Sequence, residues 1–148
     1  VYQNRRARPV SYAYNKPQAN SMWASRNMGL LGTIILVFIV THMANFWFRM
    51  HWGPIGTDPA GNKDLWTVVY AFFQSPGTGL WFTLFYVLGM AALGFHLFHG
   101  FQSAFQSLGV RHERYTPVIK FLGYGLSIVF PLFFAAIPVF IYASGINS

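Results

Sequence analysis

The chain has 148 residues, of which 54% are hydrophobic, 20% are aromatic and only 9% are charged. Soluble domains carry about 25% charged residues, so this composition excludes an ordinary soluble fold and indicates a membrane protein. The absence of cysteine excludes disulfides, thiolate metal sites and cysteine-ligated iron–sulfur clusters within the chain.

Long stretches without charge predict the transmembrane helices. Asp, Glu, Lys and Arg are absent from residues 29–48, 65–110 and 121–148, and about 20 apolar residues cross a bilayer as a helix. We therefore expect an all-α membrane protein, a transmembrane helix bundle forming a single membrane domain over residues 1–148. The expected spans are residues 28–48, 79–103 and 118–142.

Basic residues predict the orientation of these spans. The chain has 10 Lys and Arg against 3 Asp and Glu, but the excess lies in loops beside the spans, so we expect lipid contacts and no nucleic-acid partner. Most basic residues precede the first span or separate the second span from the third. The positive-inside rule then places residues 1–27 and 106–117 in the cytoplasm or a mitochondrial matrix, and residues 49–78 on the opposite side.

The loop after the first span contains a further predicted element. Residues 53–64, GPIGTDPAGNKD, are rich in turn formers, and the following LWTVVYAFFQS is too short to span. We expect it to form a short interfacial helix on the outer side. Four tryptophans are positioned for an aromatic belt there: Trp47, Trp52, Trp66 and Trp81.

Three further features concern the ends of the chain and of its helices. Gly109 is expected to end the second long helix, and Pro131 and Pro138 are expected to kink the third. The chain begins at Val1 in a polar, basic stretch without the apolar core of a signal peptide. We interpret it as a fragment of a longer protein.

Two histidines, His42 and His96, lie inside the apolar stretches. An ionisable side chain at membrane depth is costly and is by default a functional-site hypothesis. It indicates a proton path, a hydrogen-bonded core residue or an axial ligand of haem iron. A proton relay would pair histidine with an intramembrane acid, whereas Asp58, Asp64 and Glu113 all lie in loops.

The neighbours of the two histidines favour a haem ligand. The positions one and two turns from His96 on its own face are mostly small: Gly89, Ala92, Leu93, Gly100 and Ser103. Small residues allow a neighbouring helix to approach, but they also leave room for a flat macrocycle. Near His42, Asn45 and Arg49 are candidates to meet haem propionates, although an interfacial cation reaching lipid headgroups is the alternative for Arg49.

The two histidines are expected at different depths. His42 lies about 10 Å from Arg49 at the outer end of its helix, whereas His96 lies about 25 Å from Gly79, at 1.5 Å per residue. We therefore expect two separate haem sites, each needing a second ligand from outside this chain. His99 is rotated away from the face of His96 and is expected to be a hydrogen-bonded packing residue.

The stretch GFHLFHGFQSAFQSLGVRHERYTPVIKFLG, residues 94–123, resembles the fourth helix and following loop of the cytochrome b subunit of succinate dehydrogenase, of the two-haem, five-helix type. SMWASRNMGLLG and VTHMANFWF, within residues 21–48, resemble its third helix. The resemblance covers nearly the whole chain and lacks the first two helices of the family. It implies that His42 is a ligand of the outer haem b and His96 a ligand of the inner haem b. The partner ligands would come from the missing N-terminal helices or from another membrane chain.

The resemblance also implies a function, that of a haem-binding anchor in the bacterial inner membrane. The implied partners are the flavoprotein and iron–sulfur subunits of succinate dehydrogenase, with docking at the cytoplasmic face of residues 1–26 and 106–120. Electrons would pass through the inner and outer haems to a quinone, with menaquinone expected. We place the quinone near His42, Asn45, Trp47 and Arg49. A fumarate reductase subunit and a haem-less structural anchor are the alternatives.

Overall fold

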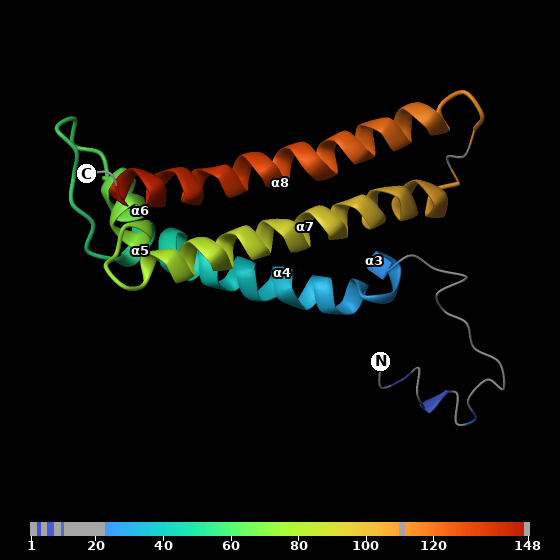
Figure 1. Cartoon of the computed structure of the whole chain (residues 1–148), viewed down its shortest axis with the longest axis horizontal. Coiled ribbons are helices and arrows are strands. Elements are labelled where there is room, and N and C mark those ends of the chain that lie inside the picture. The colour runs from blue at the N-terminus through green and yellow to red at the C-terminus, as the bar shows by residue number, and fades with distance from the viewer. Residues whose placement is uncertain (1–2, 4–5, 8–9, 11–22, 110–111, 147–148) are drawn as a thin grey trace.

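The computed structural model describes residues 3, 6–7, 10, 23–109 and 112–146. Three long helical segments lie side by side with α7 in the middle, and a short helix, α6, lies across one end (Figure 1). The elements are α3 (Trp23–Arg26), α4 (Met28–His42), the π-helix η1 (Met43–Phe48), α5 (Arg49–Trp52), α6 (Leu65–Phe73), α7 (Gly79–Ser107) and α8 (Thr116–Ile146). The described part of the chain contains no strand, only an isolated bridge between Thr57 and Lys63, so the expected all-α fold is confirmed.

Three helical segments are long and apolar enough to cross a membrane: Met28–Trp52, Gly79–Ser107 and Thr116–Gly145. The expected number and order of spans are correct, and the chain is a multi-pass membrane protein. The helical segments extend beyond the expected spans at four of the six ends, because a helix does not stop where the hydrocarbon stops. The 29 residues of α7 extend about 43 Å at 1.5 Å per residue, well beyond a hydrocarbon core of about 30 Å.

Glycine brings α7 and α8 close together. A Cβ atom added to Gly94 would lie 3.1 Å from the carbonyl oxygen of Ser127, and one added to Gly123 would lie 2.3 Å from the ring of Phe101. Pro131 stands four residues after Ser127 and has no N–H to offer that carbonyl. The backbone of Gly94 therefore packs directly against the Ser127 carbonyl, which lacks its usual hydrogen bond within the helix because Pro131 has no N–H.

The other side of α7 packs antiparallel against α4. A Cβ added to Gly89 would lie 2.5 Å from the ring of Phe38, and Ala92 is buried together with Leu31. Part of the small-residue stripe near His96 is thus filled by α4, as expected for residues that let helices approach. Gly100 has no atom within 4 Å of an added Cβ, so the stripe is open at that point.

Polar contacts fix α6 across one end of the bundle. The Asp64 carboxylate accepts a hydrogen bond of 3.0 Å from the backbone N–H of Thr67 and caps the helix. At the other end of α6, the side-chain amide of Gln74 donates to the carbonyl of Ile141 at 3.1 Å and to Ser144 Oγ at 3.3 Å. The expected short helix is therefore present and is tied to α8.

Two glycines of α7 give a matched test of this packing. Gly89→Ala should lower the free energy of unfolding by about 1–3 kcal/mol, because the new methyl group overlaps the ring of Phe38 and overpacking costs that much. Gly100→Ala introduces the same methyl group into open space and should be neutral or stabilising. Thermal unfolding in detergent, followed by circular dichroism, measures both, and equal stability of the two variants would contradict this packing.

Candidate functional site

His42 lies where the first transmembrane helix changes its geometry. It is the last residue of α4, and the π-helix η1 begins at Met43. π-helical turns are rare and occur frequently at functional sites. No pattern in the sequence pointed to this segment, since its apolar residues fit an α-helix equally well.

The surroundings of the His42 ring are aromatic. It stacks on Phe38 with ring centroids 5.7 Å apart, and it lies 5.3 Å from Phe46 and 5.9 Å from Tyr86. These contacts come from α4, η1 and α7. The ring is nevertheless exposed, so it can also contact a group outside the bundle.

His42 lines a cavity of about 430 Å³ between the helices. Cavities of about 300–1,000 Å³ with few polar groups are typical of small-molecule sites. The polar side chains among its walls are those of His42 and Tyr86, and the remaining walls are apolar: Phe38, Phe46, Leu65, Val69, Phe73, Met90, Leu93, Phe134, Ile137 and Pro138.

The hydroxyl of Tyr86 is buried in this wall, where the Asn45 side chain is close to it but makes no well-aligned hydrogen bond. The residue is 6% exposed, and among the described residues its oxygen has no partner of acceptable geometry. The Asn45 side chain of η1 interacts with it from the neighbouring helix. Because buried polar groups nearly always have a hydrogen-bond partner, an unpaired one requires an explanation. Tyr86 was missed in the sequence, where a single tyrosine in an apolar helix resembles any core residue.

His96 lies deeper in the bundle, where α7 passes Gly32 of α4. A Cβ added to Gly32 would lie 3.9 Å from His96 Cε1. The Nδ1 atom of His96 is buried and has no hydrogen-bond partner within the described part of the chain. Ser103, one of the residues expected to flank a macrocycle, is exposed.

The structure places the two histidines at different levels. His42 contacts Tyr86 and His96 lies beside Gly32. The ten-residue separations from Gly32 to His42 along α4 and from Tyr86 to His96 along α7 each correspond to about 15 Å. The two helices thus give the same difference in depth, in agreement with the expectation from the helix ends.

Of the residues expected beside His42, Asn45 remains close to it through Tyr86, whereas Trp47 and Arg49 do not line its cavity. Asn45 is directed to Tyr86, whereas Trp47 packs on His51 and Trp52 with ring centroids 4.4 and 5.1 Å apart. Arg49 lines a separate cavity of about 370 Å³. The expected grouping assumed a regular α-helix, and the π-helix changes the direction of each residue that follows His42.

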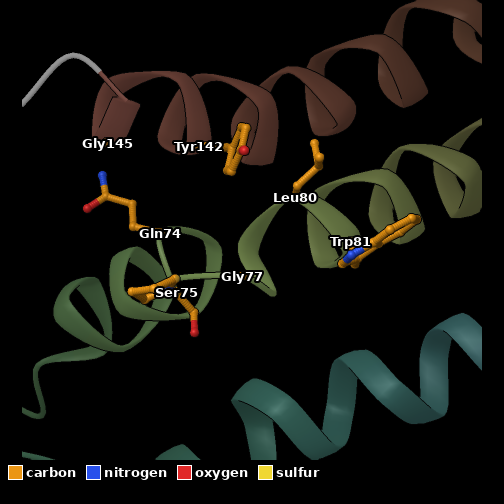
Figure 2. A pocket seen from close by; sticks show the side chains of 8 residues that line it. Gln74, Ser75, Gly77, Leu80, Trp81, Tyr142 and Gly145 are labelled. Atoms are coloured by element: carbon orange, nitrogen blue, oxygen red, sulfur yellow. The ribbon is translucent and has the colours of Figure 1, made fainter.

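Another cavity, of about 280 Å³, lies between α6, α7 and α8 (Figure 2). Gln74, Leu80, Trp81 and Tyr142 surround it in Figure 2. The amide of Gln74 already donates to α8, so this side chain joins the helices and is not an unpaired group awaiting a ligand. Trp81 is exposed, as are the other tryptophans of the expected aromatic belt.

The other histidines have different environments. His99 Nδ1 is buried and has no hydrogen-bond partner among the described residues, so the expected hydrogen bond is not formed through this atom. His51 Nδ1 lies 2.8 Å from the carbonyl oxygen of Trp47, and His112 is exposed near the turn before α8. Arg111 and most of the expected docking segment 1–26 lie outside the described residues.

Comparison with protein-family models, with curated proteins and with solved structures finds no match to this chain. The function must therefore be inferred from the site itself.

The two histidines fit haem ligation in their chemistry. A neutral imidazole nitrogen is the common axial ligand of haem iron, and the buried Nδ1 of His96 is not engaged by the described residues. His42 is exposed beside aromatic rings, the surroundings that a macrocycle prefers. Each of the two histidines would contribute one ligand to a haem, and the other ligand of that haem would come from outside this chain.

Asp64 provides a test of how α6 closes the cavity. Hydrogen bonds from the side chain and then the backbone of Thr67 lower the pKa of Asp64 below its ordinary value of 3.8. Asp64→Ala should speed amide hydrogen exchange in α6 at neutral pH, because the cap is lost. Because folding lowers the pKa of Asp64, the difference in exchange rate between the variant and the wild type should be fully present at pH values above the ordinary pKa. It should disappear as the pH falls through the lowered one. A difference that persists after Asp64 is protonated would contradict the capping role.

Proposed function

We propose that this chain is a haem-b-binding membrane anchor of a succinate dehydrogenase, and that it passes electrons from an iron–sulfur subunit to a quinone. The observation that carries the proposal is the pair of imidazoles in transmembrane helices at levels about 15 Å apart, His42 beside an apolar cavity and His96 beside Gly32. The resemblance of residues 21–48 and 94–123 to the two-haem family adds the identity of the enzyme.

In the proposed route, succinate is oxidised to fumarate at a flavin outside the membrane. That oxidation releases two electrons and two protons, and the quinone takes up two electrons and two protons to become a quinol. The haem groups supply the one-electron chemistry between the two reactions. The role of this chain is to hold them at two depths, His96 nearer the cytoplasmic side and His42 nearer the opposite side.

His42 and His96 would each supply one ligand to a haem, so a further ligand for each haem would come from another helix. The first span has room for a neighbouring helix. Only 11% of its most apolar 18-residue stretch is buried inside the bundle, whereas the values for the second and third spans are 28% and 22%. Leu36, Val40 and other large apolar side chains of α4 are exposed. We infer that these ligands come from N-terminal helices of the same protein or from another membrane chain.

The inner end of the bundle is the proposed docking face for the iron–sulfur subunit. α3 and the first residues of α8 lie at this end (Figure 1). Arg26 of α3, Arg114 in the turn before α8 and Lys120 of α8 are exposed. Contacts of these cations with anionic lipid headgroups are the alternative. The proposed docking face suits electron entry, because His96 is nearer to this face than His42 is.

A haem-less structural anchor is the main rival interpretation, and a fumarate reductase subunit would use the same route in reverse. A structural anchor would bury histidine with a hydrogen-bond partner. Within the described part of the chain, the Nδ1 atoms of both His96 and His99 are buried without a hydrogen-bond partner. The choice of His96 as the ligand therefore rests on the resemblance to the two-haem family, which does not give the direction of the reaction.

Visible spectroscopy of single variants tests the haem proposal. His42→Leu and His96→Leu should each remove one b-type haem and leave the other, because each histidine supplies one axial ligand. Reduced-minus-oxidised spectra of the purified protein with its natural partners measure the remaining haem.

His99→Leu is the matched control, since it removes a histidine from the same helix and keeps His96. It should retain both haems. Wild-type spectra in both the His42 and His96 variants would refute the haem proposal and favour the structural anchor.

A further inference from the structure

We propose that the cavity lined by Arg49 binds the phosphate group of a phospholipid, with the Arg49 guanidinium and the Ser75 hydroxyl as hydrogen-bond donors. The cavity has a volume of about 370 Å³ and lies between the end of the first span, α6 and the start of α7. It is separate from the cavity beside His42, whose walls do not include Arg49. The inference does not rest on the proposed function, because it involves neither haem nor quinone.

Arg49 brings a single positive charge to this cavity. It is the only Lys, Arg, Asp or Glu in the span Met28–Trp52. Among the described residues, no acidic side chain and no second cation line the cavity. The acids that follow Arg49 in the chain form hydrogen bonds elsewhere, Asp58 within its own loop and Asp64 with Thr67. The charge of Arg49 therefore lacks a counter-ion in the cavity, and a bound anion would supply one.

Ser75, just beyond the end of α6, supplies a hydroxyl to the same cavity. Its Oγ accepts a hydrogen bond of 3.0 Å from Thr78 Oγ1, so its own proton is available to an acceptor in the cavity. The hydroxyl of Thr67 also lies in the wall, but it already donates to Asp64. The guanidinium of Arg49 can form two parallel N–H···O bonds with an oxyanion, which is the usual way in which arginine binds phosphate. One guanidinium and one hydroxyl therefore suit a phosphate group.

The remaining walls of the cavity indicate which kind of phosphate fits. They are apolar and include Val68, Ala71, Phe72 and Phe82. The phosphodiester of a phospholipid carries one negative charge, which a single guanidinium neutralises, and its acyl chains can pack on these walls. A phosphate monoester carries a charge of about −1.5 to −2 at neutral pH, so part of that charge would stay uncompensated beside apolar groups. The cavity therefore favours a phospholipid over a free phosphate.

The position of the cavity along the bundle matches the level of lipid headgroups. α5 and α6 lie together at one end of the bundle (Figure 1), and Arg49 is in the last turn of the first span. Tryptophan is enriched where a membrane meets water. Four exposed tryptophans are close in sequence to residues that line the cavity: Trp47, Trp52, Trp66 and Trp81. The cavity thus lies at the depth at which lipid phosphates are found.

Lipid binding tests the assignment with two variants of different kinds. The protein is purified with its natural partners, its lipids are removed by detergent exchange, and the dissociation constant of dioleoyl phosphatidylglycerol is measured by native mass spectrometry. Arg49→Gln should raise the dissociation constant about tenfold, because charge-assisted hydrogen bonds to the phosphate are lost. Ala71→Leu keeps the charge of Arg49 but adds volume at the cavity wall, and it should also weaken binding about tenfold.

Each variant has a matched control outside the cavity. Lys63→Gln removes one positive charge near the end of the first span, where the Lys63 ammonium donates to the backbone carbonyls of Met50 and His51 and does not line the cavity. Ala91→Leu adds the same volume at an exposed position of α7 that is not part of the cavity. Both controls should bind phosphatidylglycerol as the wild type does.

Unchanged lipid binding in either Arg49→Gln or Ala71→Leu would overturn the assignment. Equal weakening by Lys63→Gln or by Ala91→Leu would also overturn it, since the effect would then not be specific to the cavity. Dioleoylglycerol, which has the same acyl chains without phosphate, should bind at least about tenfold more weakly than phosphatidylglycerol, and equal binding would show that the phosphate is not recognised. Displacement of the lipid by millimolar inorganic phosphate would identify free phosphate as the ligand and refute the lipid site.

Discussion

The structure depends on how closely backbone can approach backbone along α7. Lipid chains are as apolar as leucine, so association of helices within a membrane relies on packing rather than on exclusion of water. Gly94 brings the backbone of α7 against the backbone of α8, and Gly89 leaves room for the Phe38 ring of α4. Since α7 touches both neighbours, the position of His42 relative to Tyr86, and the cavity between them, follow from these two contacts.

The fold could be predicted from the sequence because it depends on properties that sum over many residues. Absence of charge located all three spans, the short segment after residue 64 was correctly expected as α6, and Gly109 has the positive φ of 68° expected of a helix end. The helix ends were less predictable, since a helix continues through the headgroup region until a turn stops it.

The site was harder to predict because it depends on local departures from regular geometry. His42 and His96 stood out as ionisable residues at depth, and their difference in level followed from counting residues. The π-helix depends on hydrogen-bond register, which amino-acid composition does not reveal. It separates Asn45, directed to Tyr86, from Trp47, directed to His51. Tyr86 becomes notable only when its buried hydroxyl is located in the cavity wall.

Two redox centres at separate levels would also couple the reaction to the membrane potential. Moving one charge across the full membrane is worth about 2.3 kcal/mol per 100 mV. A step of about 15 Å covers about half of a hydrocarbon core of about 30 Å and so experiences a corresponding part of that energy. In the proposed arrangement, the voltage aids or opposes electron transfer between the levels of His96 and His42 according to its direction. The packing of α7 on α4 then has a functional consequence, because it fixes how far apart the two levels lie.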